Sequence, residues 1–540
     1  WSNPVDLLLA GQLDKAPRFQ LRHRTLQQWG RWHGSSVRGL LGARVQLLPH
    51  QLYIAHEVGQ RFAPRVLLAD EVGLGKTIEA GLILHQKILS GRASRVLIVV
   101  PDSLVHQWFV EMLRRFNLPF SLLDEERCSE LESSNDGQNP FESTQLVICS
   151  LSLLEHETSR FQQVLEASWD LVIVDEAHHL HWTPEQASPA YVCIEALAQL
   201  CAGLLLLTAT PEQLGSEAHF ARLRLLDPAR YPDLQEYLQE EASYAPLNEL
   251  IQQLLAEGGY QHLQASTEMQ KQLSEYLGES SLQQLLSDLQ TEEGPEQIIL
   301  EAAKALLDRH GTGRVLFRNT RHAIEGFPAR QLFSWPLPAP PAYEQNLAGA
   351  DIMERLQAEV LLGEDWIEQD PRVVWLLDWL KSHRTEKTLV ICAQATTAID
   401  LESHLTLRGG VRAAVFHEQL TLIERDRAGA WFADLTDGAQ VLVCSEIGSE
   451  GRNFQFASHL IFFDLPLNPD LLEQRIGRLD RIGQQTDVSI HVPYYEHSAQ
   501  EVLLKWYHEG MQAFERPFAG GQRVFQQFEN ELTACLLNVA

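Results

Sequence analysis

Short apolar runs alternate with mixed helical or loop segments along the first half of the chain. Between residues 45 and 228 the runs begin near positions 65, 95, 145, 170 and 203. Apolar runs without polar alternation are typical of parallel strands that are covered on both faces. The pattern predicts a parallel sheet flanked by helices, and we assign this first lobe to residues 41–235.

The same alternation returns in a second unit at residues 372–495. Its apolar runs begin near positions 387, 412, 439, 459 and 487. Strands that alternate with helices indicate a second parallel sheet. The predicted fold class is therefore α/β, with two parallel-sheet lobes.

The chain between and after these lobes has a different pattern. Leu, Gln and Glu recur at helical spacing after position 236 without β-branched runs, which predicts a helical insertion over residues 236–330. A Pro-rich stretch predicts an extended connector within residues 331–371, and residues 496–540 predict helices that brace the second lobe.

Composition supports a multi-domain protein without membrane spans. A chain of 540 residues exceeds what one hydrophobic core supports, and no apolar run is long enough to cross a bilayer. The seven cysteines form no CxxC pair, which favours reduced thiols and a cytoplasmic location. The chain begins at Trp1 without an initiating Met, so we expect it to be a piece of a longer protein.

Charge is unevenly distributed. The net charge of −29 argues against a protein broadly coated with nucleic acid, because phosphate binding needs clustered Lys and Arg. Residues 1–40, in contrast, are rich in Arg and poor in acid. This segment is either a surface for nucleic acid or a partner, or a basic linker that leads into the first lobe. We expect a narrow cationic groove on an acidic body.

A glycine-rich turn carries the clearest chemical signal. DEVGLGKT, residues 70–77, follows a predicted strand and opens a predicted helix. Gly73 and Gly75 allow backbone N–H groups to face phosphate oxygens, Lys76 supplies positive charge, and Thr77 supplies a hydroxyl for Mg²⁺. Asp70 stands where the strict P-loop pattern requires glycine, so the turn departs from that pattern at one position. The turn predicts nucleotide binding.

Two carboxylates follow another apolar run. Asp175 and Glu176 end the strand predicted at LVIV, residues 171–174, where parallel sheets place their ligands. Asp175 can hold Mg²⁺, directly or through water, and Glu176 can polarise the attacking water. Thr208 and Thr210 end the next predicted strand. They either relay the state of the carboxylates or form an ordinary polar turn.

Positive charge recurs in the second lobe. Arg475, Arg478 and Arg481 are three residues apart, which on a helix or a helix-like turn brings them toward one face. Arginine from another domain stabilises the transferred phosphoryl group. The alternative is a solvated helix with salt bridges.

In this order the segments resemble the motifs of helicase-like motors, and specifically of Swi/Snf-type ATPases. The resemblance implies two RecA-like lobes that bind ATP and Mg²⁺ in their cleft and close on double-stranded nucleic acid. It places Gln51 in an adenine-reading element and Asp70 and Leu74 in the nucleotide loop. Gln474, Arg478 and Arg481 fall on the Q-x-x-G-R-x-x-R positions, with the two arginines as fingers.

The resemblance also implies contacts with nucleic acid. They fall on Gln107 in the segment VVPDSLVHQW, and on Ser445, Arg452 and Asn453 in VLVCSEIGSEGRNFQ. The latter segment departs from the usual Ala-Gly-Gly-Leu at residues 447–450.

Phrases such as HGTGRVLFRNTR and AAVFHEQLTLIERDRA resemble a bacterial branch that associates with RNA polymerase. That branch implies a monomeric motor that releases and recycles polymerase. Two alternatives stay open: a translocase or helicase without polymerase contact, and a polymerase-binding module whose ATP site is regulatory.

Overall fold

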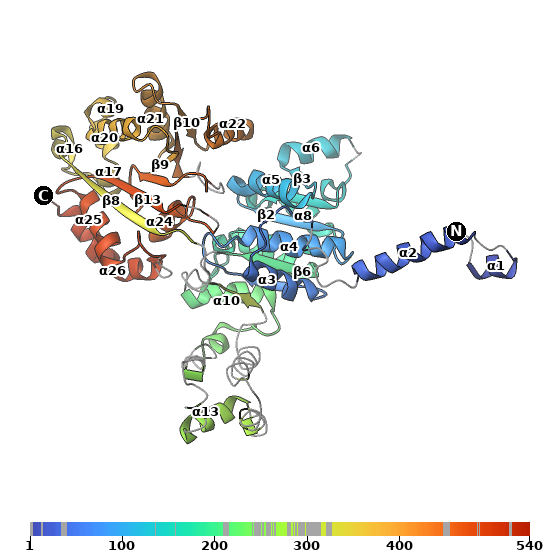
Figure 1. Cartoon of the computed structure of the whole chain (residues 1–540). Helices are drawn as coiled ribbons and strands as arrows, with labels where there is room; N and C mark the ends of the chain where they lie inside the picture. Colours follow the sequence, from blue (N-terminus) through green and yellow to red (C-terminus); the bar gives the residue numbers. More distant parts are fainter. Residues whose placement is uncertain are drawn as a thin grey trace.

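Two parallel β-sheets organise the chain (Figure 1). In this computed structural model, the described part of the first sheet has seven strands in the order β3-β4-β2-β5-β6-β1-β7, and that of the second has six in the order β10-β11-β9-β12-β13-β8. Every registered strand pair in them is parallel. The predicted α/β fold with two parallel-sheet lobes is confirmed.

The structure describes residues 4–11, 15–33, 40, 42–134, 137–156, 158–208, 215–239, 241, 250, 253–254, 261, 263, 266–277, 282–283, 286, 289, 298, 315–319, 327–446, 454–482, 484, 486–517 and 521–539.

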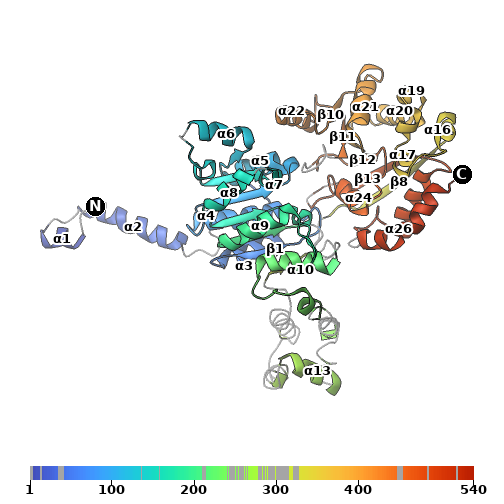
Figure 2. The ribbon, with the colours of Figure 1, turned by 180° about the vertical axis from the view of Figure 1, so that it is seen from behind.

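The first sheet contains β1 (Arg65–Leu68), β2 (Val96–Val100), β3 (Ser121–Leu123), β4 (Leu146–Ser150), β5 (Leu171–Val174), β6 (Gly203–Leu207) and β7 (Leu316–Phe317). Alternate residues feed two cores, because Val66 and Leu68 face one core and Leu67 faces the other. The first core includes α3 (Pro49–Gln60), α4 (Lys76–Leu89) and α5 (Val105–Phe116). The other face is covered by α7 (Leu151–His156), α8 (Thr158–Glu166), α9 (Pro189–Leu200) and α10 (Gly215–Leu226), of which α9 lies toward the viewer in Figure 2.

The second sheet contains β8 (Arg330–Leu337), β9 (Thr388–Cys392), β10 (Ala413–Phe416), β11 (Val441–Ser445), β12 (His459–Phe462) and β13 (Val488–Tyr495). One face packs on α20 (Pro371–Ser382) and α21 (Ala395–Leu407), and the other on α24 (Pro469–Ile476), α25 (Ala499–Lys505) and α26 (Gly521–Leu537). Five predicted strand positions in each lobe correspond to observed strands. Strands β3, β7 and β8 were not predicted.

The predicted connector requires a correction. Its Pro-rich start is extended but forms β8, which pairs along its length with β13 at the edge of the second sheet. Pro336 is tolerated there because an edge strand pairs on one side only. The following α16 (Pro341–Asn346), α18 (Ala358–Leu362) and α19 (Trp366–Gln369) pack on the same lobe, as does α17 (Ile352–Leu356).

The predicted insertion also contributes to the first sheet. Its described helix α13 (Thr267–Leu277) lies away from both sheets in Figure 1, and Leu250, Leu263 and Leu273 share a small separate core. The chain then returns as β7, which pairs with β1. A strand of two residues is too short to show the alternation that reveals strands in a sequence.

The N-terminal segment forms α1 (Pro4–Leu9) and the 18-residue helix α2 (Ala16–His33), which projects from the first lobe (Figure 1). Within the described ranges, no helix is both long and apolar enough to cross a membrane. All seven cysteines carry free thiols, and six of them are buried.

Candidate active site

A cavity of 380 Å³ lies between the two lobes. Its first-lobe lining includes Gly73, Gly75, Lys76, Thr77, Gln107, Asp175, Glu176 and His178. Its second-lobe lining includes Asn468, Asp470, Leu471, Gln474, Arg478 and Arg481. Predicted site residues from both lobes therefore meet in one cavity.

The glycine-rich turn has the backbone conformation that its sequence requires. Gly73 and Gly75 have φ angles of 89° and 93°, in the left-handed region that favours glycine. A Cβ on Gly75 would lie 2.6 Å from Nε2 of Gln51. Helix α4 begins directly afterward at Lys76, so the turn delivers a helix N-terminus to the cavity.

Gln51 and Leu74 support this turn from outside the cavity. Nε2 of Gln51 donates to the Leu74 carbonyl at 2.9 Å, and Gln51 is buried. Neither residue lines the cavity, so the contact of Gln51 with adenine stays a prediction. Asp70 is also outside the lining and fully buried.

Asp175 and Glu176 leave β5 at its carboxyl end. Oδ2 of Asp175 accepts a hydrogen bond of 2.8 Å from Nε1 of Trp108, and Oδ1 accepts one of 2.8 Å from the Glu176 amide. Glu176 has a φ of 49°, a left-handed conformation that is uncommon for a non-glycine residue. Nδ1 of His178 lies 3.1 Å from Oε2 of Glu176.

The two carboxylates have opposite electrostatic environments. Burial, and then the negative charge of Glu176, raise the pKa of Asp175. Burial also opposes ionisation of Glu176, but the hydrogen bond and charge of His178, with Lys76, hold its pKa below the usual range. Glu176 is therefore suited to accept a hydrogen bond from water, whereas Asp175 is suited to a nearby cation.

The residues present fit Mg²⁺. Burial and a neighbouring carboxylate make the ionised form of Asp175 costly, and a cation would relieve that cost. The Thr77 side chain lies in the same cavity. Asp175 and Thr77 are the residues that could hold the ion, as the sequence predicts.

The three arginines separate into two groups, which corrects the expectation of a common face. Helix α24 begins after the cap Asn468, whose side chain accepts from the Asp470 amide, and ends at Ile476. Only Arg475 lies on the helix. Its buried guanidinium pairs with Glu446 and Asp464, so it braces the second lobe. Arg478 and Arg481 follow the helix and line the cavity.

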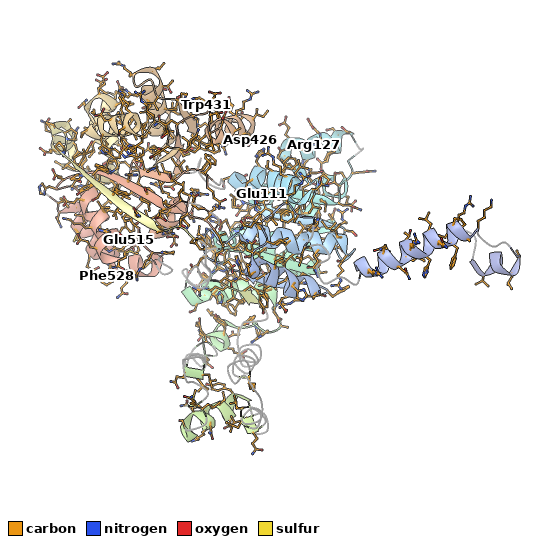
Figure 3. The ribbon with its side chains drawn as sticks, in the orientation of Figure 1. Glu111, Arg127, Asp426, Trp431, Glu515 and Phe528 are labelled. Carbon is orange, nitrogen blue, oxygen red and sulfur yellow. The ribbon has the colours of Figure 1, made fainter. Side chains whose placement is uncertain are left out.

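The two lobes touch beside these arginines. A Cβ on Gly477 would lie 2.5 Å from Cγ1 of Val72. Val72 belongs to the glycine-rich turn of the first lobe, residues 70–77, which is called the phosphate turn below. Only glycine permits this close approach. A second contact joins helix α22 (Leu422–Ala433) to α5: Oδ2 of Asp426, which is labelled in Figure 3, lies 3.4 Å from Nε2 of His106.

Two of the four predicted nucleic-acid residues, Gln107 and Ser445, lie in the part of the chain that the structure describes. Gln107, near the start of α5, lines the cavity between the lobes. Ser445 is buried and donates to Oε2 of Glu418 at 2.7 Å. Arg452, Asn453 and Thr210 lie outside the described residues, whereas Thr208 is buried at the end of β6. These nucleic-acid contacts stay predictions.

The contacts of three further residues at the site, Trp108, His178 and Asp470, were not predicted from the sequence. Trp108 and His178 each contact a carboxylate of the site. Asp470 lines the cavity from α24, and burial raises its pKa to about 6. Asp470 is close enough to His178 of the first lobe for their charges to interact. Local sequence does not predict this, because it depends on how the two lobes meet.

Comparison with known families agrees with this geometry. Residues 57–299 match the SNF2-related domain, residues 371–483 match the helicase conserved C-terminal domain, and residues 487–539 match the RNA polymerase recycling family C-terminal domain. The chain therefore contains an SNF2-related domain followed by a helicase conserved C-terminal domain, as its resemblance to Swi/Snf-type ATPases implied.

Among individual proteins, the chain is similar to the RNA polymerase-associated protein RapA. It is 52% identical to RapA of Photobacterium profundum, over 99% of this chain and 57% of that protein. It is also 52% identical to RapA of Klebsiella pneumoniae, over 98% of this chain and 56% of that protein. The chain thus spans little more than half the length of these relatives.

A solved structure, the Sulfolobus solfataricus SWI2/SNF2 ATPase core in complex with dsDNA, is 15% identical and covers 92% of this chain and 98% of its own. Its TM-score is 0.37.

Proposed function

We propose that the chain is an ATP-hydrolysing motor that acts on double-stranded nucleic acid and, within a longer cytoplasmic protein, releases and recycles RNA polymerase. The observation that carries the ATPase is the shared cavity. One lobe contributes a phosphate turn and two carboxylates, and the other contributes two arginines.

The roles follow from the chemistry of phosphoryl transfer. Backbone N–H groups of the turn and the N-terminus of α4 hold phosphate oxygens, and Lys76 adds positive charge. Glu176 orients the attacking water. Arg478 and Arg481 stabilise charge that develops on the transferred group.

Lys76 has a defined hydrogen-bond partner within the turn. Its Nζ donates to the Asp70 carbonyl at 2.8 Å. Mg²⁺, held by Thr77 and Asp175, would neutralise phosphate charge when bound.

The RNA polymerase partner is proposed from similarity. The RapA relatives are RNA polymerase-associated by name, and residues 487–539 match the polymerase recycling family. In this structure those residues include β13, α25 and α26, on the side of the second lobe that carries α24. We propose that polymerase affinity resides outside the ATP cavity and that the chain acts as a monomer.

The test is phosphate release from Mg-ATP by the parent and by Lys76→Ala. We expect loss of a phosphate-binding charge to lower turnover by about 10²–10³ or more. Lys381→Ala is a matched control, because Lys381 is exposed on α20, away from the cavity. Equal phosphate release by the parent and Lys76→Ala would contradict the ATPase.

The same preparations separate the alternatives. Stimulation by double-stranded DNA without strand displacement supports a translocase and opposes a helicase. Lys76→Ala should still co-elute with RNA polymerase but fail to support repeated transcription. Joint loss of co-elution and turnover, with circular dichroism unchanged, would contradict the separation of partner binding from nucleotide binding.

A further inference from the structure

The chain that returns from the helical insertion ends against the phosphate turn. The Leu67 amide donates to the Val315 carbonyl at 2.7 Å, and the Ala69 amide donates to that of Phe317 at 2.8 Å. The ladder continues past β1, because the Glu71 amide donates to the Asn319 carbonyl at 3.3 Å. Asn319 therefore lies beside the first residues of the turn.

Asn319 also binds the side chain of Asp70. The backbone amide of Asn319 donates to Oδ1 at 2.7 Å. Its side-chain Nδ2 lies 3.1 Å from Oδ1 and 2.9 Å from Oδ2. Asp70 is fully buried. A buried carboxylate without hydrogen bonds is costly, so these donors matter to the turn.

A second carboxylate increases this dependence. Glu79 of α4 is also fully buried. Burial, followed by the charge and hydrogen bonding of Asp70, raises the pKa of Glu79 well above its usual value. The side-chain amide of Asn319 is a neutral donor, so it provides hydrogen bonds to the Asp70 carboxylate without adding a further charge beside Asp70 and Glu79.

The backbone of Asp70 in turn holds the catalytic lysine. Nζ of Lys76 donates to the Asp70 carbonyl at 2.8 Å. A continuous chain of hydrogen bonds therefore leads from Asn319 through Asp70 to Lys76. Asn319 is 249 residues away from Asp70 in the sequence.

We propose that Asn319 is a positioning residue for the phosphate turn. Through Asp70 it sets the position of Lys76, and through β7 it makes the end of the helical insertion part of the nucleotide site. The kinetic consequence rests on the proposed ATPase function. Loss of the contact loosens the turn but keeps the charge of Lys76, so it weakens nucleotide binding in the ground state and the transition state alike.

The kinetic test compares Asn319→Ala with the parent. Because one hydrogen-bonding side chain on a charged group is lost while the backbone donor remains, we expect KM for ATP to rise about tenfold with kcat within about twofold. Asn346→Ala is the control: Nδ2 of Asn346 donates to the backbone carbonyl of Leu361 at 2.7 Å, at an exposed site of α16. This control should match the parent.

Exchanging the two side chains tests complementarity. Asn319→Asp places a third carboxylate beside Asp70 and Glu79, and should raise KM more than Asn319→Ala. Combining it with Asp70→Asn restores one amide and one carboxylate, and should recover part of the loss. Absence of any recovery, with both single variants folded, would contradict the proposal.

A purely structural role predicts a different result. It lowers kcat in proportion to the folded fraction and leaves KM unchanged. That result, or KM for Asn319→Ala equal to that of Asn346→Ala, would overturn the proposal.

Hydrogen exchange of residues 69–76 without nucleotide decides the contact independently of turnover. We expect faster exchange in Asn319→Ala than in Asn346→Ala. Equal exchange would overturn the proposal even if the parent hydrolyses ATP, whereas faster exchange in a chain without ATPase activity would reject only the proposed function.

Discussion

The two lobes share an architecture but contribute different charged groups to the cavity. The first lobe contributes carboxylates at the end of β5, next to a phosphate turn whose lysine already contacts a backbone carbonyl. The second lobe contributes arginines, and it neutralises one of them internally: Arg475 pairs with Glu446 and Asp464. The comparison shows that arginines in one motif have different surroundings: Arg475 is paired within the second lobe, whereas Arg478 and Arg481 line the cavity.

The largest expected effect concerns the arginines that line the cavity. Arg478→Ala and Arg481→Ala should each lower kcat by about 10²–10⁵ and change ATP affinity much less, because they act on charge that develops during transfer. Steady-state phosphate release gives kcat, and nucleotide titration gives affinity. The control is Arg408→Ala, which removes an exposed arginine of the same lobe. A loss confined to affinity would make these arginines ordinary binding residues.

The brace should show the opposite pattern. Arg475→Ala leaves Glu446 and the buried Asp464 without their partner, and should destabilise the second lobe by about 3–5 kcal/mol. Urea unfolding measures this loss. The unfolding free energy of Arg478→Ala should be close to that of the parent. Equal destabilisation by both variants would contradict the separate structural role of Arg475.

A smaller expected effect is a loss of stability of the second lobe as pH falls. Burial, with the charges of His459 and His383, lowers the pKa of His491 to about 3. The unfolded chain keeps the usual value and binds the proton more readily, so stability is lost as pH falls from about 6.5 toward 3, by up to about 1.4 kcal/mol per pH unit. Urea unfolding at pH 7 and pH 5 should show the loss, and His491→Gln should reduce it. An unchanged slope would exclude His491 as its source.

Sequence patterns predicted the parts of the site that depend on local order. Lys76 after a glycine turn, and Asp175 with Glu176 after an apolar strand, occupy the predicted cavity. Sequence patterns did not predict contacts between residues that lie far apart in the chain. The ion pairs of Arg475, the hydrogen bond from Trp108 to Asp175, and the contact of Asn319 with Asp70 all join separate elements.

Strand length and edge position explain the remaining errors in the fold. β7 has two residues, so it shows no periodicity. β8 contains prolines that are typical of a connector, yet it pairs with β13 as an edge strand.

The most direct test of the central claim, that the two lobes form one cavity for ATP hydrolysis, is single-turnover hydrolysis of bound Mg-ATP by Glu176→Gln. The amide keeps the size of the side chain but is a much weaker acceptor for the attacking water. We predict nucleotide affinity near that of the parent and a hydrolysis rate lower by about 10²–10⁴. Hydrolysis at the parent rate would contradict the assignment of Glu176, and with it the chemistry proposed for this cavity.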